Sequence, residues 1–127
     1  MDAATGSLVL RDLSDRVIGA FFDTYNELEY GFLESVYENA LAVRLGECGL
    51  QVERQVPIEV RFHGQVVGQF RADMLVEGRL LIEIKAGSQI AVAHEAQLLN
   101  YLKATGIRLG LLFNFGPRPD FRRRVFS

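Results

Sequence analysis

Two carboxylates and an ammonium lie close together in the stretch from Phe70 to Lys85. Asp73 and Glu83 stand ten positions apart, and Lys85 follows two positions later. Each group must be hydrated, paired or metal-bound, because a lone charge is costly to bury. Mg²⁺ prefers carboxylate oxygens and keeps several waters. On Asp73 and Glu83 it would polarise a phosphate and activate water, with Lys85 orienting that water or offsetting charge on the phosphate. The same residues also fit an exposed strand pair joined by a salt bridge.

Strand periodicity tests whether the two acids meet. Side chains alternate between faces, so Asp73 lies opposite an apolar face that includes Ala72 and Met74, and Glu83 and Lys85 share one face of the next strand. If both apolar faces enter one core, Asp73 and Glu83 emerge on the same side. A two-residue hairpin would pair positions whose numbers sum to an odd value. We therefore expect an odd-length loop over residues 77–79, or a nearby bulge.

Two helical patterns flank this hairpin. The first holds Glu34, Tyr37, Glu38 and Leu41 on one side at helical spacing, so Glu34 is positioned to add a carboxylate, directly or through water. A solvated helix charge is the alternative for Glu34. The second pattern places His94, Gln97 and Tyr101 along one helical face, which suits substrate contact or support of the site and equally suits a solvent-facing stripe. With two histidines and no paired thiolates, a zinc site is not expected.

Composition bounds the class of protein. The 127 residues, 49% of them hydrophobic, predict one domain over residues 1–127 with a loose end at residues 1–7. A net charge of −2 argues against a nucleic-acid coat protein. The single cysteine, Cys48, fits a reducing cytoplasm, and we expect neither a membrane span nor a signal peptide.

The order of the predicted elements indicates a mixed α/β fold. Helical periodicity covers residues 8–28 and 32–47, as two helices or as one helix broken near Gly31. Strands are expected over 51–55, 58–62, 65–76 and 80–85, with Pro57 at an edge or irregular point. A helix over 92–105 then leads to a strand over 109–115 that is buried on both faces and pairs parallel with the strand ending near Lys85. The arginine-rich residues 118–127 are consistent with three roles: a solvated end, partners of local acids, or contacts with phosphate.

Several ordered motifs resemble one family. Residues 31–37 match the pattern that names the GxxExxY proteins, and the likeness continues through residues 71–73, 82–86, 94–102 and 111–116. That family is similar to the PD-(D/E)XK nuclease superfamily. The resemblance implies a restriction-endonuclease-like core, a small mixed β-sheet flanked by helices. It implies Asp73, Glu83 and Lys85 as the acid–acid–lysine set, Glu34 as an added helix acid, and Gln97 and Tyr101 as residues facing the site. Leu28-Glu29 departs from the Leu-Gly pair expected before the first motif.

Two functions follow as hypotheses. The first is a nuclease or phosphodiesterase that depends on Mg²⁺ or Mn²⁺ held by Asp73, Glu83 and Glu34, with nucleic acid as partner. His94, Gln97, Tyr101 and Tyr37 would contact substrate or support the site. The second is a catalytically silent module of the same fold that binds nucleic acid or a protein. A homo-oligomer in which the basic tail of one subunit completes a groove on another is a further possibility.

Overall fold

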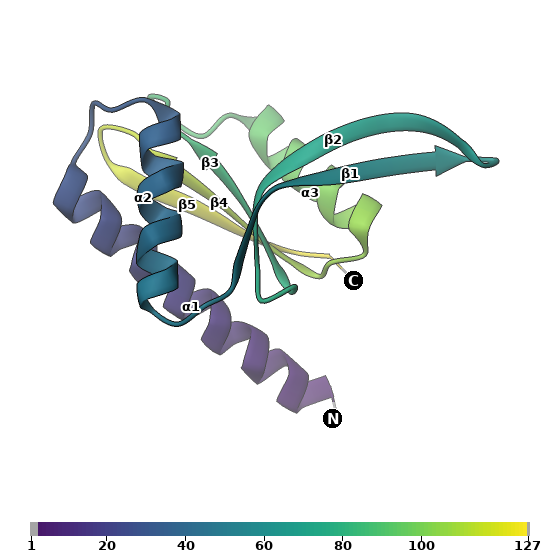
Figure 1. Cartoon of the computed structure of the whole chain (residues 1–127), viewed down its shortest axis with the longest axis horizontal. Helices are drawn as coiled ribbons and strands as arrows, with labels where there is room; N and C mark the ends of the chain where they lie inside the picture. The colour runs from purple at the N-terminus through teal and green to yellow at the C-terminus, as the bar shows by residue number, and fades with distance from the viewer. Residues whose placement is uncertain (1–2, 127) are drawn as a thin grey trace.

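The computed structural model describes residues 3–126, with side chains from residue 9 onward. Three helices and five strands follow one another along the chain (Figure 1). Their bounds are α1 Ala3–Leu28, α2 Glu34–Glu47, β1 Val52–Phe62, β2 Gln65–Val76, β3 Leu80–Lys85, α3 Val92–Thr105, β4 Leu109–Phe115 and β5 Pro119–Val125. The predicted bounds of β2, β3, α3 and β4 are confirmed, and the break near Gly31 separates two helices.

The five strands form one mixed sheet in the order β1-β2-β3-β4-β5. Neighbouring strands are antiparallel except β3 and β4, which run parallel and are joined through α3. This parallel pairing was predicted, because a crossover helix returns the chain in the same direction. Every residue of β4 is buried, as its unbroken apolar run predicted.

Helices cover both faces of the sheet. On one face α1 and α2 enclose the main core, in which Phe21 stacks on Phe113 with ring centroids 4.3 Å apart. On the other face α3 packs against β4 so closely that a Cβ on Gly110 would lie 2.8 Å from Leu98 Cδ1. Figure 1 shows these layers, with α1 and α2 on the near side of the sheet and α3 behind it. The mixed sheet flanked by helices confirms the predicted fold class.

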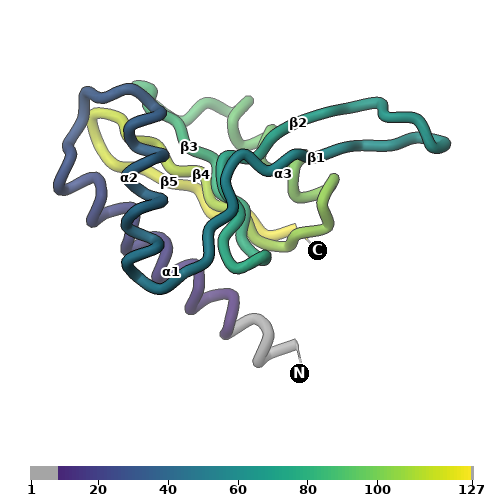
Figure 2. The backbone as a smooth tube through the Cα atoms, viewed as in Figure 1, coloured from purple at the N-terminus to yellow at the C-terminus, as the bar shows by residue number. Residues whose placement is uncertain are grey.

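Beyond the body of the sheet, β1 and β2 continue as a two-stranded arm (Figures 1 and 2). The arm bends at Gln55, whose φ of 52° is left-handed, at the position across from Asp73 in the β1–β2 register. Because of this bend, Met74 packs into the main core while Ala72 packs on the α3 side. The prediction that Ala72 and Met74 share one apolar face was therefore wrong.

The two ends of the chain also differ from the expectation. The strand predicted over 51–55 and the one predicted over 58–62 are a single edge strand, β1, which passes through Pro57. The arginine-rich end forms β5, whose Phe121 packs against the main core. Residues 3–7, expected to be loose, belong to α1, and residues 1, 2 and 127 lie outside the described part of the chain.

Candidate functional site

The β2–β3 hairpin has the register that the acidic pair requires. Met74 pairs with Ile82 and Val76 with Leu80, so residues 77–79 form the predicted odd-length loop. Glu77 and Gly78 both take positive φ in this turn, at 54° and 65°. When this register is continued one position beyond the last pair, Met74 and Ile82, it places Asp73 opposite Glu83. The two acids therefore emerge on the same face, as predicted.

Asp73 sits where β2 leaves β3. The paired positions end at Met74 and Ile82, because β2 then turns into the arm. Beyond this point the Ile84 N–H donates to Asp73 Oδ2 over 2.7 Å. A carboxylate thus replaces a strand carbonyl as the acceptor, which fixes the position of one Asp73 oxygen and leaves Oδ1 for other contacts.

Glu83 is nearly enclosed, with 3% of its surface exposed, and its Oε1 has no hydrogen-bonding partner in the described chain. The pKa of Glu83 is raised to about 9, because burial and, after it, contact with the Asp73 carboxyl outweigh the lowering effects of Lys85 and of the Asp73 backbone N–H. Two carboxyls pressed together in a dry site cannot both ionise without a compensating cation. The pair is therefore able to share a proton or to receive a positively charged ligand.

Lys85 and Glu34 border this pair from two elements. Lys85 ends β3, half-buried, and makes no ion pair within 4.0 Å among the described residues. Glu34 is the first residue of α2. Burial raises the pKa of Glu34, Lys85 counteracts this rise, and Asp73 adds to it, so Lys85 and Asp73 both lie within electrostatic reach of Glu34.

No three or more His, Cys, Asp or Glu side chains within residues 3–126 converge closely enough to hold a metal ion. Asp73 and Glu83 are therefore brought together as a pair, and Glu34 does not complete a three-carboxylate cluster with them. Direct coordination by Glu34 would require its side chain to move. Contact through a water, the other route expected for Glu34, stays a prediction.

Helix α3 brings two of its three predicted residues toward the acids or Lys85. Burial raises the pKa of Tyr101, and Glu83 and Asp73 add to this rise, so the phenol lies near the pair. His94 Nδ1 accepts the Ala91 N–H over 3.2 Å at the start of α3. Burial and Lys85 lower the pKa of His94, which favours the neutral ring that this bond requires. Gln97 is half-buried one turn before Tyr101, and its contact with substrate stays a prediction.

The polar stripe predicted on α2 divides into different roles. Tyr37 is fully buried, and its hydroxyl accepts the Phe32 N–H over 3.1 Å and donates to the Glu29 carbonyl. These contacts make Tyr37 a support of the loop that precedes Glu34. Glu38 accepts from Arg54 over 2.7 Å and from Gln55 over 2.9 Å, which holds the bend of β1 across from Asp73.

Two residues that support the site were missed from the sequence. Asn114, buried in β4 beside Lys85, accepts the Gly87 N–H and donates to the Gly87 carbonyl, each over 3.0 Å. Gly116 leaves no room for a side chain, because a Cβ there would lie 2.4 Å from the Gly87 oxygen. Together they fix the loop that leaves Lys85. In the sequence, Asn114 could have been noticed because it is the single amide side chain inside the apolar run of residues 109–115.

The comparisons with known proteins decide the family. A family model of the PD-(D/E)XK nuclease superfamily matches residues 11–125. The chain belongs to the PD-(D/E)XK nuclease superfamily. No curated protein matches its sequence. The finer likeness to the GxxExxY proteins stays a prediction, as do the roles of the individual site residues.

Two solved structures share the fold of this superfamily member, and a third is similar over a part of it. The crystal structure of SSO0001 has a TM-score of 0.57 and 24% identity, covering 72% of this chain and 48% of that one. An alkaline exonuclease (LHK-Exo) from Laribacter hongkongensis has a TM-score of 0.55 and 18% identity, covering 73% and 56%. The Holliday junction resolvase Hjc from Archaeoglobus fulgidus reaches a TM-score of 0.44 with 24% identity, covering 70% and 72%.

The chain spans about half the length of the first two of these structures. Their identity to the chain is low, so they support the restriction-endonuclease-like fold and leave the activity open. Among the described residues, none of the helices combines the length and the apolar character that crossing a bilayer demands.

Proposed function

We propose that this chain is a nuclease that hydrolyses phosphodiester bonds with the help of Mg²⁺ or Mn²⁺ bound at Asp73 and Glu83. The observation that carries the proposal is Glu83 Oε1, which is buried without a hydrogen-bonding partner beside a second carboxyl. A structural acid in such a place would have a donor or a counter-charge. The superfamily membership of residues 11–125 supports the same conclusion.

The donor set fits a hard divalent cation. Two carboxylates supply the oxygen ligands that Mg²⁺ prefers, and Mg²⁺ uses one or two carboxylates with waters and substrate phosphate in its other positions. The cation would act as a Lewis acid toward the phosphate and acidify water beside it. Asp73 presents its free oxygen because its other oxygen is bonded to Ile84 N–H. Zinc is disfavoured because the pair includes no thiolate or imidazole.

Lys85 contacts the substrate, and Tyr101 and Asn114 support the site. Lys85 shares the face of Glu83 and has no ion pair within the described chain, so its ammonium is available to a phosphate oxygen. There it offsets negative charge that develops in the transition state. Tyr101 limits the access of water to Glu83 from the α3 side, because it is itself 4% exposed and packs on Phe70. The backbone bonds of Asn114 hold the loop after Lys85 in place.

Cleavage assays with single-stranded DNA, duplex DNA and RNA test the proposal, each with Mg²⁺, Mn²⁺ or EDTA. We expect metal-dependent cleavage that is lost in Asp73→Asn and Glu83→Gln. Glu53→Gln and Lys103→Met are matched controls, because both residues are exposed. Cleavage that survives unchanged in Glu83→Gln and Lys85→Met would assign the activity to another site or to a contaminant.

Metal binding by the same protein distinguishes a nuclease from the alternative, a catalytically silent module of the same fold. Isothermal titration calorimetry measures whether Mn²⁺ binds to the wild-type chain and to Glu83→Gln. Binding that is lost in the variant supports the metal site independently of turnover. Nucleic-acid binding without any cation binding or cleavage would instead make the chain a non-catalytic member of the superfamily.

A further inference from the structure

The loop between α1 and α2 exposes three large apolar side chains within four residues. Tyr30, Phe32 and Leu33 are 54%, 50% and 77% exposed, and they form what we call the apolar rim. Burying such side chains is normally favourable, by roughly 1.5–3 kcal/mol for a Leu or Phe. A cluster left in water therefore points to a ligand.

The apolar rim directly precedes Glu34, which lies near Asp73 and Lys85. Leu33 directly precedes Glu34, the α2 residue whose pKa responds to Lys85 and Asp73. In Figure 1 the loop before α2 lies at the same end of the molecule as the loop that follows β3. A polymer whose phosphate reaches Lys85 would thus pass the rim.

The Phe32 ring is held in a defined position. The Phe32 N–H donates to the buried Tyr37 hydroxyl over 3.1 Å, and the two rings meet edge to face with centroids 6.1 Å apart. Tyr37 in turn stacks on Phe115 in the core at 4.4 Å. A ring anchored in this way loses little conformational freedom when a ligand stacks on it.

Size and charge select the kind of ligand. Three side chains on one short loop are far fewer than the roughly 20–30 residues a side of a stable protein interface. One aromatic face is enough to stack one base. The chain carries 14 basic and 16 acidic residues, which gives little general attraction for the phosphates of a duplex. Stacking is then the larger available source of affinity.

We propose that the apolar rim binds an unpaired base, so that the site takes single-stranded nucleic acid, or a strand with unpaired bases, in preference to continuous duplex. Bases inside a duplex have their faces covered by their neighbours and cannot stack on Phe32. The inference rests on the proposed function only in that the phosphate beside the bound base enters the Asp73–Glu83 site.

Fluorescence binding tests the rim separately from catalysis. The probe is a short single-stranded oligodeoxynucleotide that carries 2-aminopurine, measured with EDTA and with Ca²⁺, and the competitor is a duplex of the same sequence. We expect quenching on binding and preference for the single strand. Phe32→Leu should weaken binding by about 5- to 150-fold, the range for loss of one base–aromatic stack, and Phe32→Trp should retain it.

Phe62→Leu is the matched control. Phe62 is 63% exposed near the tip of the arm, where it stacks on His63, and it is equally aromatic but belongs to a different element. We expect Phe62→Leu to bind like the wild type. An equal loss in both variants would indicate unspecific apolar adhesion and overturn the assignment. Thermal unfolding of each variant shows whether the fold is retained.

Salt dependence supplies a second readout. Stacking releases no counterions, so Phe32→Leu should lower affinity at every salt concentration without changing the slope of log K against log salt. Lys85→Met should instead flatten that slope. Light scattering reports whether the rim pairs two copies of the chain. A dimer that dissociates in Phe32→Leu, without any change in oligonucleotide binding, would assign the rim to self-association and overturn the proposal.

The two proposals fail in different ways. Phe32-dependent binding of single strands without cleavage would contradict the nuclease and leave the rim intact. Metal-dependent cleavage with the same preference for single strand over duplex in Phe32→Leu as in the wild type would contradict the rim and leave the nuclease intact.

Discussion

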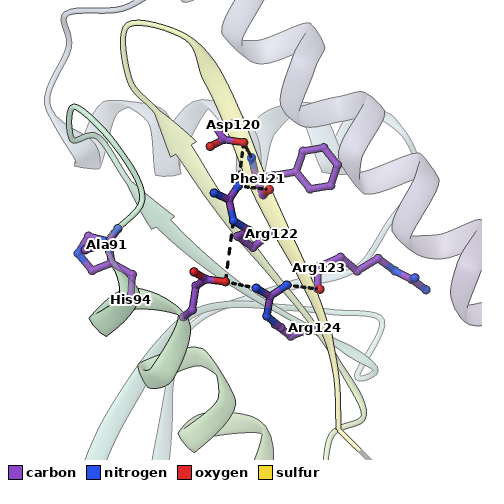
Figure 3. Close-up of polar contacts among 8 residues, drawn as sticks. Ala91, His94, Asp120, Phe121, Arg122, Arg123 and Arg124 are labelled. Carbon is purple, nitrogen blue, oxygen red and sulfur yellow. Dashed lines mark hydrogen bonds and ion pairs between the residues drawn. The ribbon is translucent and has the colours of Figure 1, made fainter.

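Glu83 and Glu95 are both withdrawn from solvent, but their surroundings are opposite. Glu95 on α3 meets Arg122 at 3.8 Å and also pairs with Arg124, and Figure 3 shows both arginines reaching from β5 toward the start of that helix. Glu83 faces another carboxyl and keeps an oxygen without a partner. An acid with counter-charges fastens two elements together, whereas an acid against an acid destabilises the fold until a cation arrives. The first pattern indicates structure and the second indicates chemistry.

The strongest test of this contrast is Glu83→Gln. We expect it to abolish metal-dependent cleavage and, without metal, to stabilise the chain by about 1–2 kcal/mol. At neutral pH the wild-type Glu83 must take up a proton on folding, and the amide avoids this cost while it can still donate to Asp73; each pKa unit of the shift corresponds to about 1.4 kcal/mol. Urea unfolding in EDTA measures the stability. A metal-free variant that is less stable than the wild type would show that Glu83 is a structural acid.

Lys85→Met should have the next largest effect. We expect cleavage to fall by about 10²- to 10³-fold, the loss typical of removing one donor that stabilises transition-state charge. Single-turnover rates at saturating Mg²⁺ measure this loss, with Lys103→Met as the control. Because Lys85 makes no ion pair within the described chain, the free energy of unfolding should change little. A large loss of stability would place Lys85 among the structural charges.

The pH dependence of stability should differ between wild type and Glu83→Gln. The pKa of Glu83 is about 9 in the folded chain and near 4.5 when unfolded, so the folded state holds a proton that the unfolded state releases. Its contribution to stability is complete below pH 4.5, declines as pH rises, and is lost above about pH 9. Urea titrations across this window in EDTA should show the decline in the wild type and not in the variant. Mn²⁺ should suppress it, and identical slopes in the two proteins would contradict the assignment.

Glu95→Gln should show the smallest effect and the opposite sign. Weakening its contacts with Arg122 and Arg124 should destabilise the chain by about 1 kcal/mol, since the group is only partly exposed. Glu59→Gln on the arm is the control, because its pair with Arg61 is exposed on both sides and should contribute less. Equal changes in melting temperature for the two variants would remove the distinction between them.

Much of the central sheet could be predicted from the sequence. The apolar runs of β3 and β4, the crossover helix and the parity of the loop over residues 77–79 depend on local patterns and on simple geometry. The same reasoning set Asp73 and Glu83 on one face. These features were accessible because each follows from alternation or from the length of a connection.

The remaining features depend on contacts between distant segments. The bend at Gln55 is held by Glu38 on α2, and nothing in the local pattern of β1 requires a positive φ there. The strand β5 could not be predicted, because an arginine-rich segment is also typical of a solvated chain end. Only the fold shows that Arg122 and Arg124 pair with Glu95. Tyr37 had helical spacing with Glu34, but its hydroxyl is used by the loop before it.

The bond from Ile84 N–H to Asp73 Oδ2 has a consequence for the interpretation of related sequences. Asp73 completes the backbone pairing of β3, so a descendant that had lost all activity would still be selected to keep an acceptor at this position. Glu83, in contrast, keeps its buried Oε1 without a hydrogen-bonding partner in the described chain. Its replacement by a neutral or apolar residue should therefore be the earlier and more informative mark of a copy that has ceased to cut nucleic acid.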